Sequence, residues 1–212
     1  MRGVAYDSTI YSYKIFNDSA AATGVDTDSE WANVINYHTT DNINISNNSW
    51  GDSSIEVNEV STSWINSNYS NTVSAFQNAV SNGTIFVWIT HNNGGAQPSW
   101  QAGMPAHIDN IESGWLAVMA VDNNLQETQY TQRCGSAAAW CVAAPGGGDD
   151  QSNSGIYAAD NDGGYIRLSG TSMAAPHVSG LLATVFERFP SLSSSAIRNR
   201  VLTTATYSGC IF

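Results

Sequence analysis

A stretch of small and hydroxylated residues in the last third of the 212-residue chain contains the residue types that a nucleophilic site requires. It reads Ser-Gly-Thr-Ser-Met-Ala-Ala-Pro-His-Val-Ser-Gly and spans residues 169–180. The turn brings Ser172 to the start of a helix, where unpaired backbone N–H groups and the helix dipole favour negative charge on a substrate oxygen. Pro176 fits if it falls in the first helical turn, where its missing N–H costs nothing. The simpler alternative is that Ser172 is only an N-cap serine.

The elements that must position this serine alternate between strands and helices. Residues 84–90 (TIFVWIT) form a continuous apolar run, which is typical of a strand buried on both faces, whereas residues 178–189 have apolar side chains at helical spacing. By the same criteria we expect strands at 8–16, 43–50, 84–90, 115–121 and 140–144, a hairpin at 154–168, and helices at 28–37, 72–81, 178–189 and 193–202. This order predicts a single α/β domain with a mainly parallel sheet.

Several of these segments resemble the subtilisin-like serine peptidases, the subtilases. The most specific is residues 170–177, Gly-Thr-Ser-Met-Ala-Ala-Pro-His, which is similar to the subtilase nucleophile motif. Residues 45–51 (ISNNSWG), 86–94 (FVWITHNNG) and 140–146 (WCVAAPG) are similar, in the same order, to the substrate-pairing strand, the oxyanion turn and the strand before the serine hairpin. The resemblance runs from Gly3 to about Thr206. In spacing and in its many tryptophans, the sequence looks most like the subtilase passenger domains of bacterial autotransporters. It implies a three-layer subtilisin-like fold.

The resemblance also implies roles for individual residues. Ser172 is expected to attack the scissile carbonyl, while the Asn92 side chain and the Ser172 backbone N–H bind the oxyanion. From the turn alone, Asn92 is equally well explained as a residue that tolerates positive φ. An extended protein or peptide substrate is expected to pair with the backbone of Ser49 and Gly51. The expected substrate-binding residues are Ser49, Trp50, Gly51, His91, Gly170 and Thr171.

Two features depart from the family pattern. His91 stands where subtilases usually have glycine, so its side chain is expected to narrow the specificity pocket or to disturb the turn. In addition, the 212 residues contain neither an Asp-Ser-Gly nor a His-Gly-Thr-His motif for the first two triad members. We therefore expect the chain to be the C-terminal part of the domain, inactive without its missing N-terminal part. Among the other histidines, His177 and His107 are expected to be structural and His38 to be a solvated turn residue.

Composition bounds the remaining possibilities. The chain has 7 basic and 18 acidic residues, and a net charge of -11 argues against nucleic acid as a partner. Cys134 and Cys141 close a short loop and are expected to form a disulfide, with two reduced thiols as the alternative. Asp149 and Asp150 follow three glycines and either bind calcium or are simply solvated, so calcium stays unassigned and no cofactor is required.

These features favour an extracellular or bacterial cell-surface protein, in which a C-terminal β-barrel is a possible further partner. Cys210 is left without an expected partner. The alternative function is a non-catalytic subtilase-like module that binds peptide or serves only as a scaffold.

Overall fold

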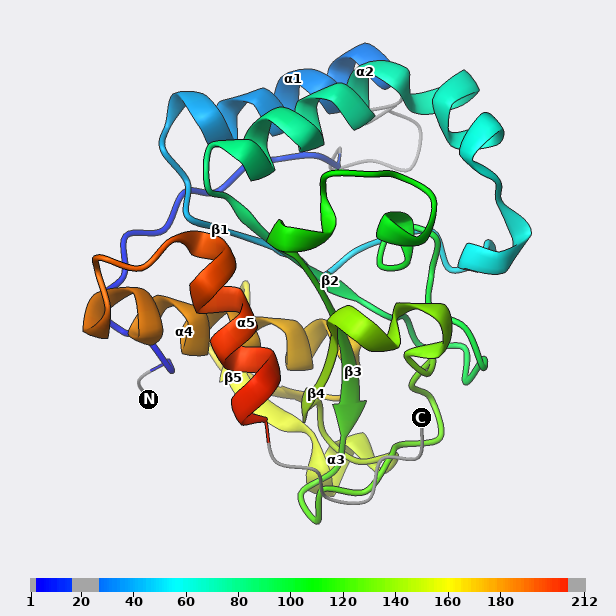
Figure 1. Ribbon diagram of the computed structural model, residues 1–212. Helices are drawn as coiled ribbons and strands as arrows, with labels where there is room; N and C mark the ends of the chain where they lie inside the picture. The colour runs from blue at the N-terminus through cyan, green and yellow to red at the C-terminus, as the bar shows by residue number, and fades with distance from the viewer. Residues whose placement is uncertain (1–2, 17–26, 206–212) are drawn as a thin grey trace.

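A computed structural model describes residues 3–16 and 27–205, which form a three-layer α/β fold. Its central sheet is parallel, with strand order β1-β2-β3-β4. Helices α1 and α2 cover one face, and helices α4 and α5 cover the other (Figure 1). The sheet strands are β1 Ile45–Asn48, β2 Ile85–Ile89, β3 Trp115–Val121 and β4 Cys141–Pro145. The helices are α1 Asp28–Thr40, α2 Thr62–Ser81, α3 Gln151–Ser154, α4 Thr171–Arg188 and α5 Ser194–Thr204. The α/β class and the parallel sheet are as the sequence predicts.

Strands β2 and β3 are buried along their whole length, which explains their continuous apolar runs. Alternate residues of β2 enter different cores. Phe86 and Trp88 pack with α1 and α2, whereas Ile85, Val87 and Ile89 pack with α4 and α5. The central strands, and with them their carboxyl ends, therefore lie between two hydrophobic cores.

Two short strands lie outside the main sheet. β5 Ile156–Ala159 and β6 Tyr165–Leu168 pair antiparallel around a turn at 160–164, as expected for the 154–168 hairpin. Four short 3-10 segments complete the described structure: η1 Val57–Glu59, η2 Met104–Ala106, η3 Glu112–Gly114 and η4 Gly135–Trp140.

Helix α2 begins ten residues before the expected position because it consists of two parts joined at a kink. Tyr69 has non-helical backbone angles (φ -137, ψ 32) within it. Beyond the kink, the Asp28 carboxylate of α1 accepts hydrogen bonds from the backbone N–H groups of Asn71 (2.9 Å) and Thr72 (2.8 Å). Burial acts to raise the pKa of Asp28, but these hydrogen bonds outweigh it and lower the pKa below the ordinary 3.8. Asp28 thus caps the part of α2 that the sequence pattern predicted.

The expected strand at residues 8–16 is wrong. Among the described residues, this segment belongs to neither sheet, and Ile10 and Tyr11 are 86% and 53% exposed. Tyr13 instead stacks on Tyr37 with ring centroids 5.9 Å apart, and its hydroxyl donates to Asp41 at 2.8 Å. Alternation of polar and apolar residues indicates strand propensity, but a strand also needs an edge to pair with.

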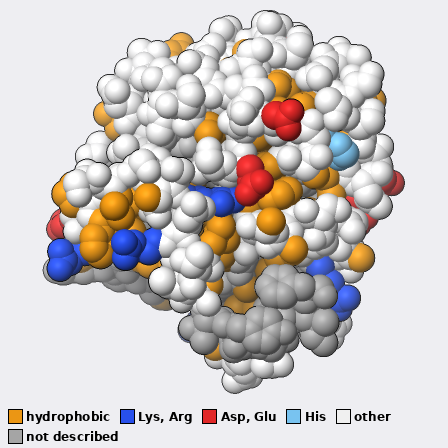
Figure 2. All heavy atoms as spheres, in the orientation of Figure 1, with side chains coloured by type: hydrophobic (Ala, Val, Ile, Leu, Met, Phe, Trp, Pro, Cys, Tyr) orange, Lys and Arg blue, Asp and Glu red, His pale blue; other side chains and the backbone are white. Residues whose placement is uncertain are grey.

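Cys134 and Cys141 form the expected disulfide, with an S–S distance of 2.07 Å. Cys210 lies outside the described residues. Figure 2 shows few Lys, Arg, Asp or Glu side chains on the visible face, which consists mostly of backbone and uncharged polar atoms with hydrophobic side chains among them. Of the helices in the described ranges, none combines the length and apolarity needed to cross a membrane.

Candidate active site

Three segments that are distant in sequence converge at the carboxyl-terminal edge of the sheet. Ser49 to Gly51 continue strand β1, and His91 and Asn92 follow strand β2. Because β1 and β2 are parallel and in register from Ile45 and Ile85, their carboxyl ends lie side by side. Helix α4 enters from the opposite face and begins here at Thr171. This is the edge at which open parallel sheets bind their ligands.

Asn92 lies at the amino terminus of α4. Its Oδ1 accepts hydrogen bonds from the backbone N–H and the hydroxyl of Thr171, both at 2.9 Å. Since a backbone N–H can only donate, the carboxamide oxygen must be the atom at this position. The Nδ2 group is therefore directed elsewhere, and it has no hydrogen-bond partner among the residues described. It lies 3.5 Å from where a Cβ on Gly170 would be, so the absence of a side chain there keeps its surroundings open.

Thr171 anchors this arrangement. It is fully buried (0% exposed), so its two donors face Asn92 rather than solvent. The N-cap residue of α4 is Gly170, which makes no side-chain cap hydrogen bond. Asn92 supplies from strand β2 the acceptor that a local N-cap residue would otherwise provide.

Ser49 and Ser172 are joined by two reciprocal hydrogen bonds. The Ser172 hydroxyl donates to the Ser49 carbonyl at 3.2 Å, and the Ser49 hydroxyl donates to the Ser172 carbonyl at 3.0 Å. Pro176 explains why the second acceptor is free. Pro176 was expected in the first turn of the helix, but it is the sixth residue of α4. A residue with an N–H at this position would donate it to the Ser172 carbonyl, and proline has none. The Ser49 hydroxyl satisfies the oxygen that the proline leaves unpaired.

His91 has a backbone conformation that favours glycine, with φ +100. Its ring links the two strand extensions. Nδ1 accepts from the Asn92 backbone N–H at 3.0 Å, and Nε2 lies 3.4 Å from the Gly51 carbonyl oxygen. This arrangement requires the tautomer with its proton on Nε2, because the first partner is a donor and the second an acceptor. The backbone of Ser49 and Gly51 was expected to pair with substrate, and in the structure the carbonyl of each contacts a side chain of the chain itself.

The other histidines do not contact Ser172 in the described structure. His177 bonds through Nδ1 to the Met173 carbonyl on its own helix at 2.8 Å, and His107 bonds through Nε2 to the Val57 carbonyl at 2.9 Å. Both are structural, as expected. The site shown by residues 3–16 and 27–205 therefore contains the serine and the asparagine but no imidazole base within hydrogen-bond distance of the serine.

Asp149 and Asp150 are engaged locally. Asp149 accepts from the Gln129 backbone N–H at 2.9 Å, and Asp150 accepts from the Ser152 hydroxyl and the Asn153 amide, both at 2.6 Å. In the described ranges, no group of three or more His, Cys, Asp or Glu side chains is placed to hold a metal ion. The two carboxylates therefore carry no assignment as a calcium site.

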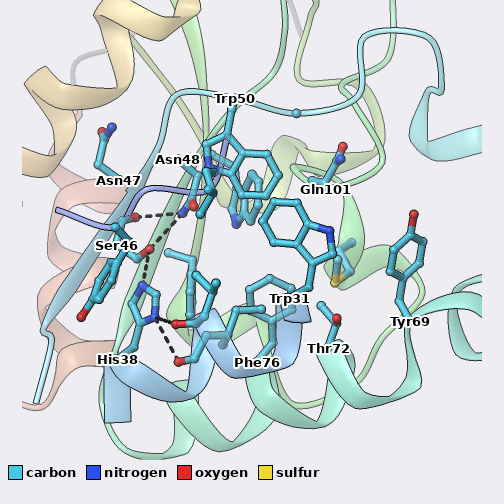
Figure 3. A pocket seen from close by; sticks show the side chains of 18 of the residues that line it. Trp31, His38, Ser46, Asn47, Asn48, Trp50, Tyr69, Thr72, Phe76 and Gln101 are labelled. Carbon is cyan, nitrogen blue, oxygen red and sulfur yellow. Dashed lines mark hydrogen bonds between the residues drawn. The ribbon is translucent and has the colours of Figure 1, made fainter. Parts of the chain in front are cut away.

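An aromatic cavity of about 330 Å³ opens beside the site, between strand β1 and helices α1 and α2 (Figure 3). We call it the aromatic cavity. Trp31 and Trp50 both line it and stack on each other, with ring centroids 4.6 Å apart and planes 15° apart. Gly51 and Gln101 also line it, and the Gln101 side-chain oxygen accepts from the Asp52 backbone N–H at 3.3 Å. The aromatic cavity is thus continuous with the Ser49–Gly51 segment.

His38 lies in the wall of the aromatic cavity, and the expectation of a solvated turn residue is wrong. It is in the last turn of α1 and is 6% exposed. Its Nε2 contacts the Ser46 hydroxyl at 2.9 Å, and its Nδ1 contacts the Ile35 carbonyl at 3.0 Å (Figure 3). Burial lowers the pKa of His38 below its ordinary 6.5. The helix was expected to end at residue 37. Because α1 continues to Thr40, His38 lies on the buried face of the helix and not in a turn.

The comparisons with known proteins agree with this architecture. The profile of the Subtilase family matches residues 1–210. Subtilisin DY of Bacillus licheniformis is 29% identical over 212 residues, covering 99% of this chain and 65% of that protein. Neisserial autotransporter lipoprotein NalP of Neisseria meningitidis serogroup B (strain ATCC BAA-335 / MC58) is 28% identical over 141 residues, covering 60% of this chain and 12% of that protein. The solved structure of the prenylagaramide maturation protease PagA has a TM-score of 0.70 at 23% identity, covering 92% of this chain and 62% of that one.

The three-layer α/β fold and these similarities define the class of protein, a serine protease domain. The chain belongs to the subtilase family, as its motifs predict. It spans less than two thirds of the length of each of these three relatives.

Three residues of the site were not identified from the sequence. Trp31 closes on Trp50, Gln101 borders Gly51, and Asn47 links strand β1 to α4 by accepting from the Ser179 hydroxyl at 2.9 Å. Gln101 and Asn47 carry no local signal, since their roles depend on distant partners.

Proposed function

We propose that this chain is part of a serine endopeptidase domain that cleaves peptide bonds through an acyl-enzyme on Ser172. The observation that carries the proposal is the position of Asn92. Thr171 binds the Asn92 side-chain oxygen, which leaves the Nδ2 group free beside Gly170, two residues before the serine. An N–H donor and the positive end of a helix dipole then act on the same place, where an oxyanion would form.

The proposed reaction proceeds in two stages. The Ser172 oxygen attacks the scissile carbonyl carbon, and the carbonyl electrons move to the oxygen, which Asn92 Nδ2 and the Ser172 N–H stabilise. The C–N bond then breaks and the amine leaves with a proton, so that an ester on Ser172 remains for water to hydrolyse. A base must accept the hydroxyl proton. In the described structure, the Ser172 hydroxyl keeps this proton and donates it in a hydrogen bond to the Ser49 carbonyl, which is too weak a base to remove it.

The proposed base and its aspartate partner come from polypeptide outside these 212 residues, in the missing N-terminal part of the same domain. Two observations support this. In the described sheet, β1 pairs with β2 on one side only, which leaves an edge that another strand can extend. The aromatic cavity lies next to that edge and offers apolar surface for such a segment to cover.

Activity-based labelling tests the proposal. We expect a fluorophosphonate probe to label a version of the protein extended at its N-terminus, and the label to map to Ser172. The 212-residue chain should react far more slowly, because its serine remains a neutral alcohol without an imidazole base. Ser172→Ala in the extended version is the matched control. Labelling at another residue, or equal labelling of the short and extended chains, would contradict the proposal.

The proposed location is outside the cell, at the bacterial surface. Its support is the Cys134–Cys141 disulfide and the similarity to an autotransporter lipoprotein. A protein or peptide is the proposed substrate, and a translocating β-barrel is a possible further partner in the whole protein. Reactivity of both cysteines with maleimide on intact cells only after reduction would support this location, whereas free thiols in freshly isolated protein would contradict it.

A non-catalytic peptide-binding module is the second candidate. One observation favours it: the ring of His91 contacts the Gly51 carbonyl, one of the acceptors that a productive substrate needs. Failure of the extended protein to label at Ser172, combined with retained peptide binding, would select this alternative.

A further inference from the structure

We propose that His91 is a specificity-determining residue that restricts the residue before the cleaved bond to glycine or another very small side chain. The inference rests on the proposed function of the site and adds the class of substrate that it accepts. Three observations carry it: the position of the ring, its two hydrogen bonds, and its backbone conformation.

The ring occupies the space between the two strand extensions. Its Nε2 lies 3.4 Å from the Gly51 carbonyl oxygen, and its Cδ2 would be 3.7 Å from a Cβ built on Gly51. A Cβ on Gly51 would also be 3.5 Å from the Gln101 side-chain oxygen. The gap beside Gly51 is therefore already bounded by an imidazole on one side and an amide on the other.

A substrate must place one particular residue over this gap. If the peptide lies along Ser49 to Gly51 and its scissile carbonyl carbon meets the Ser172 hydroxyl, the carbonyl oxygen points toward Asn92. The residue that carries this carbonyl then lies between the extension of β1 and the extension of β2. Its side chain enters the space that the His91 ring fills, so a bulky side chain requires the ring to leave.

The ring is held in place by both of its nitrogens. Nδ1 accepts from the Asn92 backbone N–H at 3.0 Å, and Nε2 faces the Gly51 carbonyl. Moving the ring would break the contact with the very residue whose amide is proposed to bind the oxyanion. A large substrate side chain is thus disfavoured twice, by direct overlap and by disturbance of the Asn92 turn.

The backbone conformation of His91 indicates that the imidazole at this position has a specific role. Its φ of +100 lies in a region that glycine adopts readily and other residues rarely. Glycine would therefore be the less strained residue here. The two ring hydrogen bonds offset part of that strain and give the imidazole one orientation.

Peptide binding to the full 212-residue chain tests the proposal without requiring catalysis. Two labelled peptide acids, Ala-Ala-Ala-Gly and Ala-Ala-Ala-Phe, are titrated into the isotopically labelled chain and followed by NMR. We expect the unmodified chain to prefer the glycine peptide by ~10-fold or more, as is typical when a pocket cannot admit a side chain. In His91→Gly the preference should disappear or reverse. His107→Gln, which changes a histidine with a structural contact elsewhere, should retain the preference.

His91→Asn provides a second variant in case the glycine substitution alters folding, because asparagine also tolerates positive φ and has a smaller side chain. It should give an intermediate preference with a native NMR spectrum. Equal affinity for the two peptides in the unmodified chain, or an unchanged preference in both His91 variants, would overturn the proposal while leaving peptide binding intact. Binding of neither peptide to any variant would overturn both this inference and the proposed function. Loss of Ser172 labelling with the preference intact would overturn only the catalytic proposal.

Discussion

Ser49 and Ser172 exchange two hydrogen bonds although 123 positions separate them in the sequence. One bond orients the candidate nucleophile, and the other satisfies a carbonyl that Pro176 deprives of its helical donor. Hydrogen bonds therefore join the segment after strand β1 to the start of helix α4, and one of them involves the hydroxyl proposed to react.

Replacement of Ser49 by alanine should destabilise the fold through the Ser172 carbonyl. The half-buried oxygen would lose its donor, and we expect a loss of about 1 kcal/mol in the free energy of unfolding. Urea denaturation measures this value. In a Pro176→Ala background the helix supplies its own N–H to the same oxygen, so the Ser49→Ala change should then cost less. Strictly additive effects of the two substitutions would show that Pro176 and Ser49 do not act on one carbonyl.

Two substitutions at Asn92 should separate its structural role from its proposed catalytic role. Asn92→Asp keeps an oxygen for Thr171 and adds negative charge at a helix start, so the unfolding free energy should be nearly unchanged. Asn92→Ala removes that acceptor and should cost about 1–2 kcal/mol, as the loss of an N-cap does. Thermal or urea unfolding of the 212-residue chain gives both values.

In the N-terminally extended protein, both Asn92 variants should react with an acylating substrate ~10²–10³-fold more slowly, a figure that comes from enzymes of this family. Initial rates, scaled to the fraction of folded protein, provide the comparison. An Asn92→Asp variant that keeps full reactivity would remove Asn92 from the proposed oxyanion site.

The buried His38 should make stability fall in mild acid. Its pKa is lowered in the folded chain, so above about pH 6.5 both the folded and the unfolded states hold it neutral and its contribution is complete. As the pH falls below this value toward the lowered folded pKa, the unfolded state binds the proton first and stability is lost. Tyr13, Phe86, Ser46 and Asp41 surround the ring or act on its charge.

The measurement is the unfolding free energy from pH 8 to pH 5 for the unmodified chain and for His38→Gln. The unmodified chain should lose more stability over this range than the variant. Asp28 does not confuse the comparison, because its own contribution is lost only in more acidic solution. Parallel pH profiles for the two proteins would contradict the assignment.

Asp28 should stabilise the second part of α2 across the kink at Tyr69. Asp28→Ala removes the acceptor for Asn71 and Thr72, and we expect a loss of about 1 kcal/mol at neutral pH. Because the folded pKa is lowered, this contribution is present above pH ~4 and disappears as the pH falls through the folded value. Amide hydrogen exchange of Asn71 and Thr72 should accelerate in the variant, while exchange in β3 serves as the internal control.

The sequence predicted the elements that are specified locally. Residues 85–89 and 115–121 form strands because their apolar runs suit a sheet covered on both faces, and the helix around Val178 follows from its apolar spacing. The string around Ser172 identified the family that the comparisons show. Patterns of this kind predict the structure correctly because each depends on side chains that are close together in the sequence.

The tertiary structure decided whatever depends on a distant partner. The segment 8–16 has strand-like alternation but joins no strand in the described sheet, and His38 follows a polar stretch yet is buried. The same is true of the site. No pattern around Asn92 indicates that Thr171 holds its oxygen, and none around His91 indicates that its ring contacts Gly51. Hydrogen bonds between strand ends and a helix start exist only after the sheet has brought them together, because their geometry belongs to the fold and not to either segment.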